Sequence, residues 1–231
     1  MFTLVIPVFN EEDNLVSLIK EIKTALANYI NFELIFVNDF SSDNTLEILK
    51  KEKKNFNFKI INNQLNLGQS YSILSGIKQS KYNIIVTLDG DGQNNPYDIP
   101  KLLEFYNKSN DIYLVGGIRS KRKDNLIKII SSRIANYVRS KFLEDGCTDT
   151  GCSLKVFDKN IFLKFEYFNG IHRFLPALFN GFGYKTFFLN VDHRKRNYGK
   201  SKYGTFLRLF NGLRDMIKVK NMINKNKKLK S

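Results

Sequence analysis

Residues 2–15, FTLVIPVFNEEDNL, contain the pattern that decides the fold. The apolar run over 2–8 has the length and composition of a buried strand, and Pro7 and Asn10 mark its end. Apolar residues at helical spacing follow over 14–29. A strand that leads through a polar turn into a helix is the repeating unit of parallel sheets, because parallel strands need long crossover connections.

The same unit recurs along the first half of the chain. Strands are predicted over 33–38, 59–62, 83–88 and 112–116, and helices over 45–54, 70–79 and 99–106. The later sequence is less regular and predicts helices over 126–142, 174–179 and 205–223, strands over 154–157 and 186–191, and a loop over 197–204. This alternation predicts an α/β fold with a doubly wound, mostly parallel sheet, in which ligands bind at the carboxyl ends of the strands.

Three of the predicted strands end in acidic or polar clusters, over 7–12, 38–43 and 89–93. Helix capping explains an acid such as Asp43 but accounts poorly for Asp89 and Asp91. Two carboxylates on either side of a glycine, followed by Gln93, offer the hard oxygen ligands that magnesium and manganese prefer. We therefore expect Asp89, Asp91 and Gln93 to bind a divalent cation that bridges to substrate phosphates.

Charge is divided unevenly between the two halves of the chain. Residues 1–118 have a net charge of −3 and no arginine, whereas residues 119–231 have a net charge of +18 and all nine arginines, which gives +15 in total. Much of the lysine excess reflects composition bias. Arginine binds phosphate oxygens through a planar fork that lysine lacks, so the clustered arginines are candidates for phosphate contacts.

Several classes of protein are disfavoured by the sequence. No stretch approaches the roughly 18–20 uncharged apolar residues that a membrane-spanning helix needs, and the N-terminus has no leader pattern. Cys147 and Cys152 are expected to be reduced thiols, and neither they nor the two histidines have zinc-site spacing. These features predict a cytoplasmic protein.

The strand-end motifs resemble those of the family 2 glycosyltransferases of the GT-A fold. The matching segments are Pro7–Glu11, Val37–Thr45, Asn66–Gln69 and Leu88–Gln93, and the resemblance covers residues 1–205. Asn38 and Phe40 depart from the family pattern, which usually has an acid and a glycine there. The resemblance implies a GT-A domain over 1–204, with a nucleotide-sugar and metal half (1–118) and an acceptor half (119–204). The donor-binding residues it implies are Pro7, Phe9, Glu11, Asn38, Asp39, Asn66, Gly68 and Asp89.

Motifs of the second half narrow the resemblance to the polyprenyl-phosphate hexosyltransferases, the group of dolichol-phosphate mannose synthase and its bacterial undecaprenyl-phosphate relatives. These motifs lie at 116–119, 132–136, 149–152, 172–177, 193–196 and 199–203. The implied phosphate and acceptor contacts are Arg119, Arg133, Arg173, Arg194, Arg196, Ser201 and Lys202. The implied catalytic residues are Asp91, Asp149, Arg119 and Arg133. His172 is interpreted as a packed or capping histidine.

The resemblance implies an inverting, metal-dependent transfer of a hexose from GDP-mannose or a UDP-sugar to a polyprenyl phosphate. A lipid phosphate is already anionic and needs no general base, so Asp149 would orient an arginine or shape the acceptor pocket. With a glycan hydroxyl as acceptor, the alternative that we keep open, Asp149 would be the base. The absence of tryptophan disfavours the processive synthases, which carry a Q-x-x-R-W motif.

The last segment, 205–231, is predicted to be a basic amphipathic helix and tail. Phe206, Phe210, Leu213 and Ile217 share one helical face, and the segment ends in lysines. It either packs on the core or lies on an anionic membrane surface, which would make the protein peripheral to the membrane. A nucleic-acid-binding module is a remote alternative and no nucleic acid partner is expected, because the basic residues lie beside phosphate-site motifs. The sequence does not indicate the oligomeric state.

Overall fold

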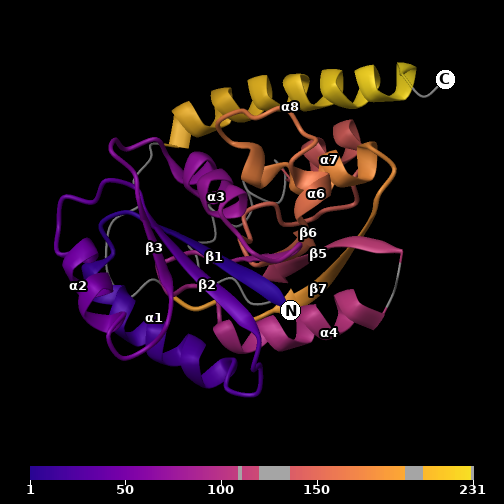
Figure 1. Ribbon diagram of the computed structural model, residues 1–231. Helices are drawn as coiled ribbons and strands as arrows, with labels where there is room; N and C mark the ends of the chain where they lie inside the picture. Colours follow the sequence, from indigo (N-terminus) through magenta and orange to yellow (C-terminus); the bar gives the residue numbers. More distant parts are fainter. Residues whose placement is uncertain (109–110, 120–135, 196–204, 230–231) are drawn as a thin grey trace.

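The structure is a computed structural model that describes residues 1–108, 111–119, 136–195 and 205–229 (Figure 1). The strands are β1 (Phe2–Val8), β2 (Phe32–Asn38), β3 (Lys59–Asn62), β4 (Ile84–Thr87), β5 (Ile112–Arg119), β6 (Lys155–Asp158) and β7 (Lys185–Val191). The α-helices are α1 (Glu12–Ala25), α2 (Thr45–Glu52), α3 (Gln69–Lys78), α4 (Ile99–Lys108), α6 (Lys159–Phe162), α7 (Leu175–Gly181) and α8 (Thr205–Lys228). Two 3₁₀ turns, η1 (Pro96–Asp98) and η2 (Ile171–Arg173), complete the main elements.

The strands form one seven-stranded sheet in the order β3-β2-β1-β4-β6-β5-β7. β1 pairs in parallel with both β2 and β4, and β2 pairs in parallel with β3. β6 runs antiparallel between β4 and β5, while β5 and β7 are parallel. The expected mostly parallel sheet is therefore confirmed, and the one antiparallel strand brings the second half of the chain into the centre of the sheet.

Register explains why the strand-end motifs meet. Val8 at the end of β1 pairs with Asn38 at the end of β2, and Val5 pairs with Thr87 at the end of β4. The polar segments that follow these three strands consequently emerge along one edge of the sheet. The sequence prediction that they share this edge is confirmed.

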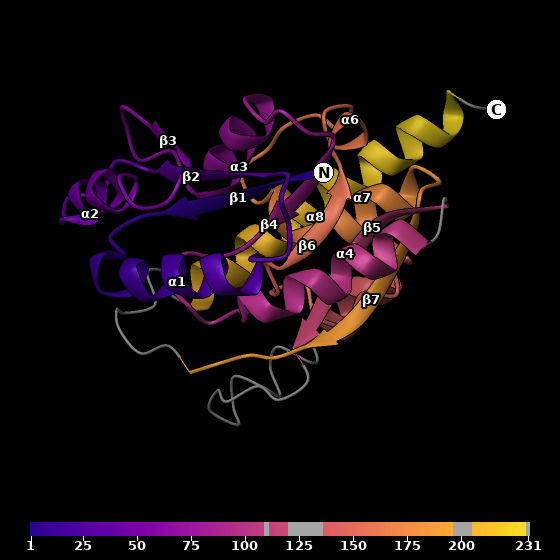
Figure 2. The same ribbon diagram turned by 60° about the horizontal axis from the view of Figure 1, so that its bottom comes forward.

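Helices cover both faces of the sheet, as Figures 1 and 2 show. One core cluster contains the buried residues of α1, α2 and α4 together with alternate β1 residues such as Leu4 and Ile6. The other contains Val5 of β1 with buried residues of α3, α6, α7 and α8. Period-two alternation along β1 thus supplies both cores, which is the arrangement of a doubly wound sheet.

The C-terminal helix α8 lies across the outside of the molecule, over α3 and α7 in Figure 1. Val219 and Ile223 are buried in the core cluster beneath it. Leu213 and Ile217, which the sequence groups on one apolar face, are 48% and 57% exposed. Of the two alternatives that the sequence leaves open, the structure shows packing on the core, through Val219 and Ile223 rather than through Leu213 and Ile217.

The expected helix over 126–142 is described only from residue 136, where residues 136–143 are helical. The remainder of that prediction, and the predicted loop over 197–204, lie outside the described residues.

Candidate functional site

The segment after β4 carries the two predicted metal-binding aspartates in a tight turn. Gly90 permits a close approach to β1, because a Cβ there would lie 2.7 Å from Val8 Cγ1. Gly92 adopts a positive φ of 71°, which favours glycine. The Gln93 amide donates to Asp91 Oδ1 at 3.1 Å. The turn therefore holds Asp89, Asp91 and Gln93 beside the end of β1.

The two carboxylates interact strongly with each other. Burial and the charge of Asp91 raise the pKa of Asp89 to about 6, against the lowering effects of Ser153, Lys155 and Arg119. Gln69, the first residue of α3, donates to Asp89 Oδ1 at 2.7 Å. Two crowded carboxylates with an adjacent amide oxygen fit a divalent cation, which would relieve their repulsion.

Within the described part of the chain, no three His, Cys, Asp or Glu side chains gather as a group able to hold a metal. Two carboxylates leave coordination positions for phosphate oxygens, which is how magnesium is commonly bound beside nucleotides. The donor set therefore fits a cation shared with a substrate diphosphate.

Asp39, at the end of β2, organises the loop before α3. Its carboxylate accepts hydrogen bonds from Asn63 Nδ2 (2.8 Å), the Leu67 amide (3.0 Å) and the Gly68 amide (2.8 Å). Gly68 has a φ of 86° and immediately precedes α3. Asp39 is buried, and Asn66 is exposed on the loop that it holds. Asp39 thus shapes the edge of the sheet where the resemblance places a nucleotide.

The turns after β1 and β2 are cross-linked by hydrogen bonds. The Glu11 amide donates to Thr45 Oγ1 at 2.8 Å, and the Asn10 amide donates to Ser41 Oγ at 3.0 Å. Asn38 is occupied within the protein, since it donates to Asn62 Oδ1 and accepts from Ser41 Oγ. Glu11 is buried, whereas Pro7 and Phe9 are half-buried beside it.

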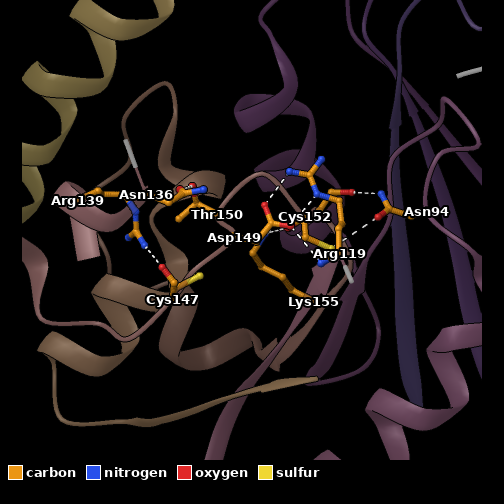
Figure 3. Close-up of polar contacts among 10 residues, drawn as sticks. Asn94, Arg119, Asn136, Arg139, Cys147, Asp149, Thr150, Cys152 and Lys155 are labelled. Atoms are coloured by element: carbon orange, nitrogen blue, oxygen red, sulfur yellow. Dashed lines mark hydrogen bonds and ion pairs between the residues drawn. The ribbon is translucent and has the colours of Figure 1, made fainter. Parts of the chain in front are cut away.

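A bidentate ion pair joins the end of β5 to the loop before β6 (Figure 3). Arg119 Nε donates to Asp149 Oδ2 and Nη2 donates to Oδ1, both at 2.7 Å, and the Arg119 amide also donates to Oδ2 at 3.1 Å. The two side chains are only 12% and 6% exposed. A Cβ at residue 151 would lie 2.6 Å from Arg119 Nη2, so Gly151 leaves the room for this pair.

Lys155 is a buried cation that the sequence-based selection missed. It lies on β6 between Thr87 of β4 and Gly116 of β5, and its Nζ donates to the Cys152 carbonyl. Its charge lowers the pKa of Asp89. A lysine in a strand of apolar residues resembles an edge or surface residue in the sequence, and only the central position of β6 reveals its burial.

Ser153 and Asn94 are two further buried polar residues that the sequence did not single out. Asn94 Nδ2 donates to Ser153 Oγ at 2.7 Å, and both residues are buried. Cys152 Sγ contacts Asn94 Oδ1 at 3.6 Å, and burial raises the pKa of the Cys152 thiol to about 12. Cys147 and Cys152 are unbridged, as the sequence predicts.

The basic segment after β7 lies against the metal motif. The Arg194 amide donates to the Gln93 carbonyl at 2.9 Å, and His193 forms a bridge with Asn94. The Arg194 side chain contacts Glu21 Oε2 at 2.6 Å and Asn95 Oδ1 at 2.9 Å. The structure therefore brings Arg194 to the predicted site, paired with an α1 carboxylate.

Arg173 lies on η2 and pairs with Asp215 of α8 at 3.0 Å, so it ties the C-terminal helix to the rest of the domain. The other predicted phosphate contacts, Arg133, Arg196, Ser201 and Lys202, lie outside the described residues. The described residues thus bring together acids at the ends of β1, β2 and β4 with Arg119, Lys155 and Arg194 from the basic half.

Comparison with known proteins identifies a family and several relatives. The model of Glycosyl transferase family 2 matches residues 3–165. This chain is 34% identical to an undecaprenyl-phosphate 4-deoxy-4-formamido-L-arabinose transferase of Pectobacterium carotovorum. The match covers 93% of this chain and 66% of that protein. Over 94% of its length, this chain is 34% identical to a dodecaprenyl-phosphate galacturonate synthase of Rhizobium johnstonii, of which it covers 65%. The chain thus spans somewhat less than two thirds of the length of these relatives.

Solved structures share the fold at low sequence identity. Glucosyl-3-phosphoglycerate synthase from Mycobacterium tuberculosis, in complex with Mn²⁺, UDP-glucose and phosphoglyceric acid, gives a TM-score of 0.72 at 16% identity, covering 94% of this chain and 79% of that one. A mannosyltransferase from Pyrobaculum calidifontis, in complex with GDP-mannose and Mn²⁺, gives 0.65 at 13% identity, covering 87% and 58%. These similarities confirm the expected GT-A fold.

Proposed function

The chain belongs to glycosyl transferase family 2, and on that premise we propose that it transfers a sugar from a nucleotide-diphosphate donor to the phosphate of a polyprenyl lipid. The curated relatives named above support this acceptor class, since both act on polyprenyl phosphates according to their names. In the proposed reaction, a lipid phosphate oxygen forms a bond to the sugar C1 while the bond from C1 to the diphosphate breaks. The electron pair of that bond leaves with the nucleoside diphosphate, and the anomeric configuration is inverted.

The observation that carries the choice of acceptor is the bidentate pair between Arg119 and Asp149. Both oxygens of Asp149 accept hydrogen bonds from Arg119, one of them also from its backbone amide. A carboxylate so occupied is poorly arranged to take a proton from an incoming hydroxyl. The Asp149 carboxylate is instead well arranged to hold the Arg119 guanidinium in place, and we propose that this guanidinium binds a substrate phosphate. An anionic acceptor needs no base, so this geometry favours a lipid phosphate over a glycan hydroxyl.

We assign the donor to the edge formed by the ends of β1, β2 and β4. Asp39 and the 63–68 loop that it holds would border the nucleoside, with Pro7, Phe9 and Glu11 on the neighbouring turn. Asp89, Asp91 and Gln93 would hold a magnesium or manganese ion, which would act as a Lewis acid on the departing diphosphate. Arg119 and Lys155 supply positive charge next to these acids and would limit the repulsion between the two anionic substrates.

We further propose that α8 contacts an anionic membrane surface through its outer side. Leu213 and Ile217 are exposed there, as are Lys225, Lys227 and Lys228. A pocket of about 370 Å³ on the same helix is lined by Glu166, Arg214, Ile217, Lys218, Asn221, Met222 and Lys225. Among the described residues, no helix has the length and apolar character needed to cross a bilayer.

A donor screen tests the proposed activity. Purified protein is incubated with undecaprenyl phosphate and either GDP-mannose or a UDP-sugar, with manganese, magnesium or EDTA, and lipid-linked sugar is followed by extraction and mass spectrometry. We expect metal-dependent product with one donor class and none with the Asp91→Ala variant. Asp111→Ala, which removes an exposed acid from the loop before β5, is the matched control and should retain activity. Turnover by Asp91→Ala equal to that of the wild type would contradict the metal assignment.

A further inference from the structure

The ring of His172 is hydrogen-bonded to a serine that the backbone in turn holds in place. Ser70 Oγ lies 2.6 Å from His172 Nδ1, and the Gly170 amide donates to the same Ser70 oxygen at 2.8 Å. The serine oxygen accepts from Gly170, and its hydroxyl proton is free to donate to Nδ1. In the tautomer in which it does so, Nδ1 is unprotonated and the ring proton resides on Nε2, and this is the tautomer that we assign.

The ring stays neutral throughout the physiological range. Burial, together with the charges of Arg173 and Lys155, lowers the pKa of His172 to about 3. A neutral imidazole with a proton on Nε2 offers one directed N–H donor and no positive charge. That property distinguishes His172 from the cations Arg119 and Lys155, which suit phosphate groups.

The backbone that carries His172 is clamped from two sides. Ser70 of α3 binds Gly170 on one side, and Asp215 of α8 pairs with Arg173 on the other. Gly170 has a φ of 107°, and a Cβ there would lie 2.6 Å from Asp215 Oδ2. This packing leaves η2 little freedom, so the ring is preorganised.

The clamp lies beside the metal motif. Ser70 follows Gln69, which donates to Asp89 Oδ1. The charge of Lys155 acts on both Asp89 and His172, so each of the two lies within electrostatic range of this lysine. Within the described part of the chain, no hydrogen bond of Nε2 to another residue is found, nor is this atom among the buried polar atoms that lack a partner.

We infer that His172 is a specificity-determining residue whose Nε2–H donates a hydrogen bond to an oxygen of the transferred sugar. This inference rests on the proposed function, because it assumes that a nucleotide sugar is bound at the edge containing Asp89. A fixed neutral donor suits a hydroxyl or ring oxygen, and the neighbouring cations suit the phosphates. His172 would then help to distinguish the sugar of the donor from the bare nucleotide.

Binding measurements test this inference independently of transfer. Isothermal titration calorimetry in the presence of Mn²⁺ measures the affinity for each bare nucleotide and for its sugars: UDP against UDP-glucose and UDP-glucuronic acid, and GDP against GDP-mannose. The proteins compared are the wild type and the variants His172→Phe, His172→Gln and Ser70→Ala. Ser80→Ala, which removes a buried hydroxyl beyond the other end of α3, is the matched control. We expect His172→Phe to weaken a nucleotide sugar on the order of 3- to 10-fold while the bare nucleotide is unaffected. His172→Gln, which restores an N–H donor, should recover part of the loss.

Three outcomes would overturn the inference. One is equal weakening of nucleotide and nucleotide sugar by His172→Phe, which would indicate a purely structural role. Another is unchanged binding of every nucleotide sugar. The third is a change confined to the KM for lipid phosphate, which would assign His172 to the acceptor. If wild-type protein binds nucleotide sugars but transfers none, the proposed function fails while the role of His172 in donor binding remains measurable.

Discussion

Replacing Asp149 with asparagine tests the assignment of this residue as a positioning group. The variant keeps one carbonyl oxygen that can accept from Arg119 but removes the negative charge. Because Arg119 and Asp149 are 12% and 6% exposed, their pair is little screened by solvent. Breaking a buried pair from one side costs about 3–5 kcal/mol, and the retained hydrogen bond places Asp149→Asn near the lower end.

A loss of about 3 kcal/mol corresponds to a fall in Tm of roughly 6–12 °C for a chain of this size. The exposed pair between Lys185 and Asp111, in which both side chains are 69% exposed, provides the control. Asp111→Asn should change stability by no more than about 0.5 kcal/mol. Differential scanning calorimetry and urea titration measure both variants.

The kinetic consequence separates positioning from base catalysis. With undecaprenyl phosphate as acceptor, a displaced Arg119 should raise the acceptor KM, and the loss of kcat should stay below about 10²-fold, whereas loss of a general base costs about 10²–10⁴-fold. An unchanged Tm would refute the buried-pair argument. A 10³-fold loss of kcat at an unchanged acceptor KM would show that Asp149 removes a proton.

Four further predictions concern other residues of the proposed site and of α8. Asp89 has a pKa of about 6 in the folded protein against an ordinary value of 3.8, so the folded state binds more protons between these pH values. The contribution of Asp89 to stability therefore falls as the pH rises from about 4 to 6, and Mn²⁺ binding should weaken below pH 6. Calorimetry measures both effects. Gly170→Ala should lower stability by about 1–3 kcal/mol in urea titrations, because its φ is 107° and its Cβ would meet Asp215; a cost below about 0.5 kcal/mol would contradict the clamp. Charge reversal at Lys225, Lys227 and Lys228 should weaken the free energy of binding to anionic liposomes by about 1 kcal/mol for each positive charge removed. A flotation assay measures this binding, and equal flotation of variant and wild type would exclude the proposed membrane face. Arg133→Ala should raise the KM for lipid phosphate more than that for the donor in steady-state kinetics, and unchanged acceptor kinetics would oppose that assignment.

The C-terminal helix illustrates how the structure changes the design of an experiment. Sequence alone leaves open whether residues 205–231 pack on the core, and deletion would appear to be a clean test of membrane binding. Val219 and Ile223 are buried under α8, and replacing one such isoleucine with alanine costs about 2–5 kcal/mol. Deletion would therefore disrupt the core, so substitutions on the exposed side are required.

Local sequence was sufficient to predict the parallel part of the fold. Each strand over 2–88 has an apolar run with a polar end, and parallel pairing alone aligns the ends of β1, β2 and β4. Long-range contacts were not predictable in this way. The pairing of Arg119 with Asp149 depends on β6 running antiparallel between β4 and β5, a topology that no local pattern signals.

Buried polar residues were the most difficult to predict. Lys155 and Ser70 look like ordinary surface residues in the sequence, because lysine is abundant in this chain and serine is common near helix starts. Their roles appear only when β6 is placed in the centre of the sheet and η2 beside α3. The family motifs identified acids and arginines by type, whereas the groups that orient them, such as Asn63 and Gln69, became visible through their contacts.

The central claim, that the acceptor is an anionic lipid phosphate that needs no base, is tested most directly by comparing two acceptors that differ in one group. The wild-type protein is supplied with Mn²⁺, the nucleotide sugar that the screen identifies, and either undecaprenyl phosphate or undecaprenol at equal concentration. The account predicts a lipid-linked sugar with undecaprenyl phosphate and none with undecaprenol. Product formation on undecaprenol, or on a glycan hydroxyl, at a comparable rate would contradict it.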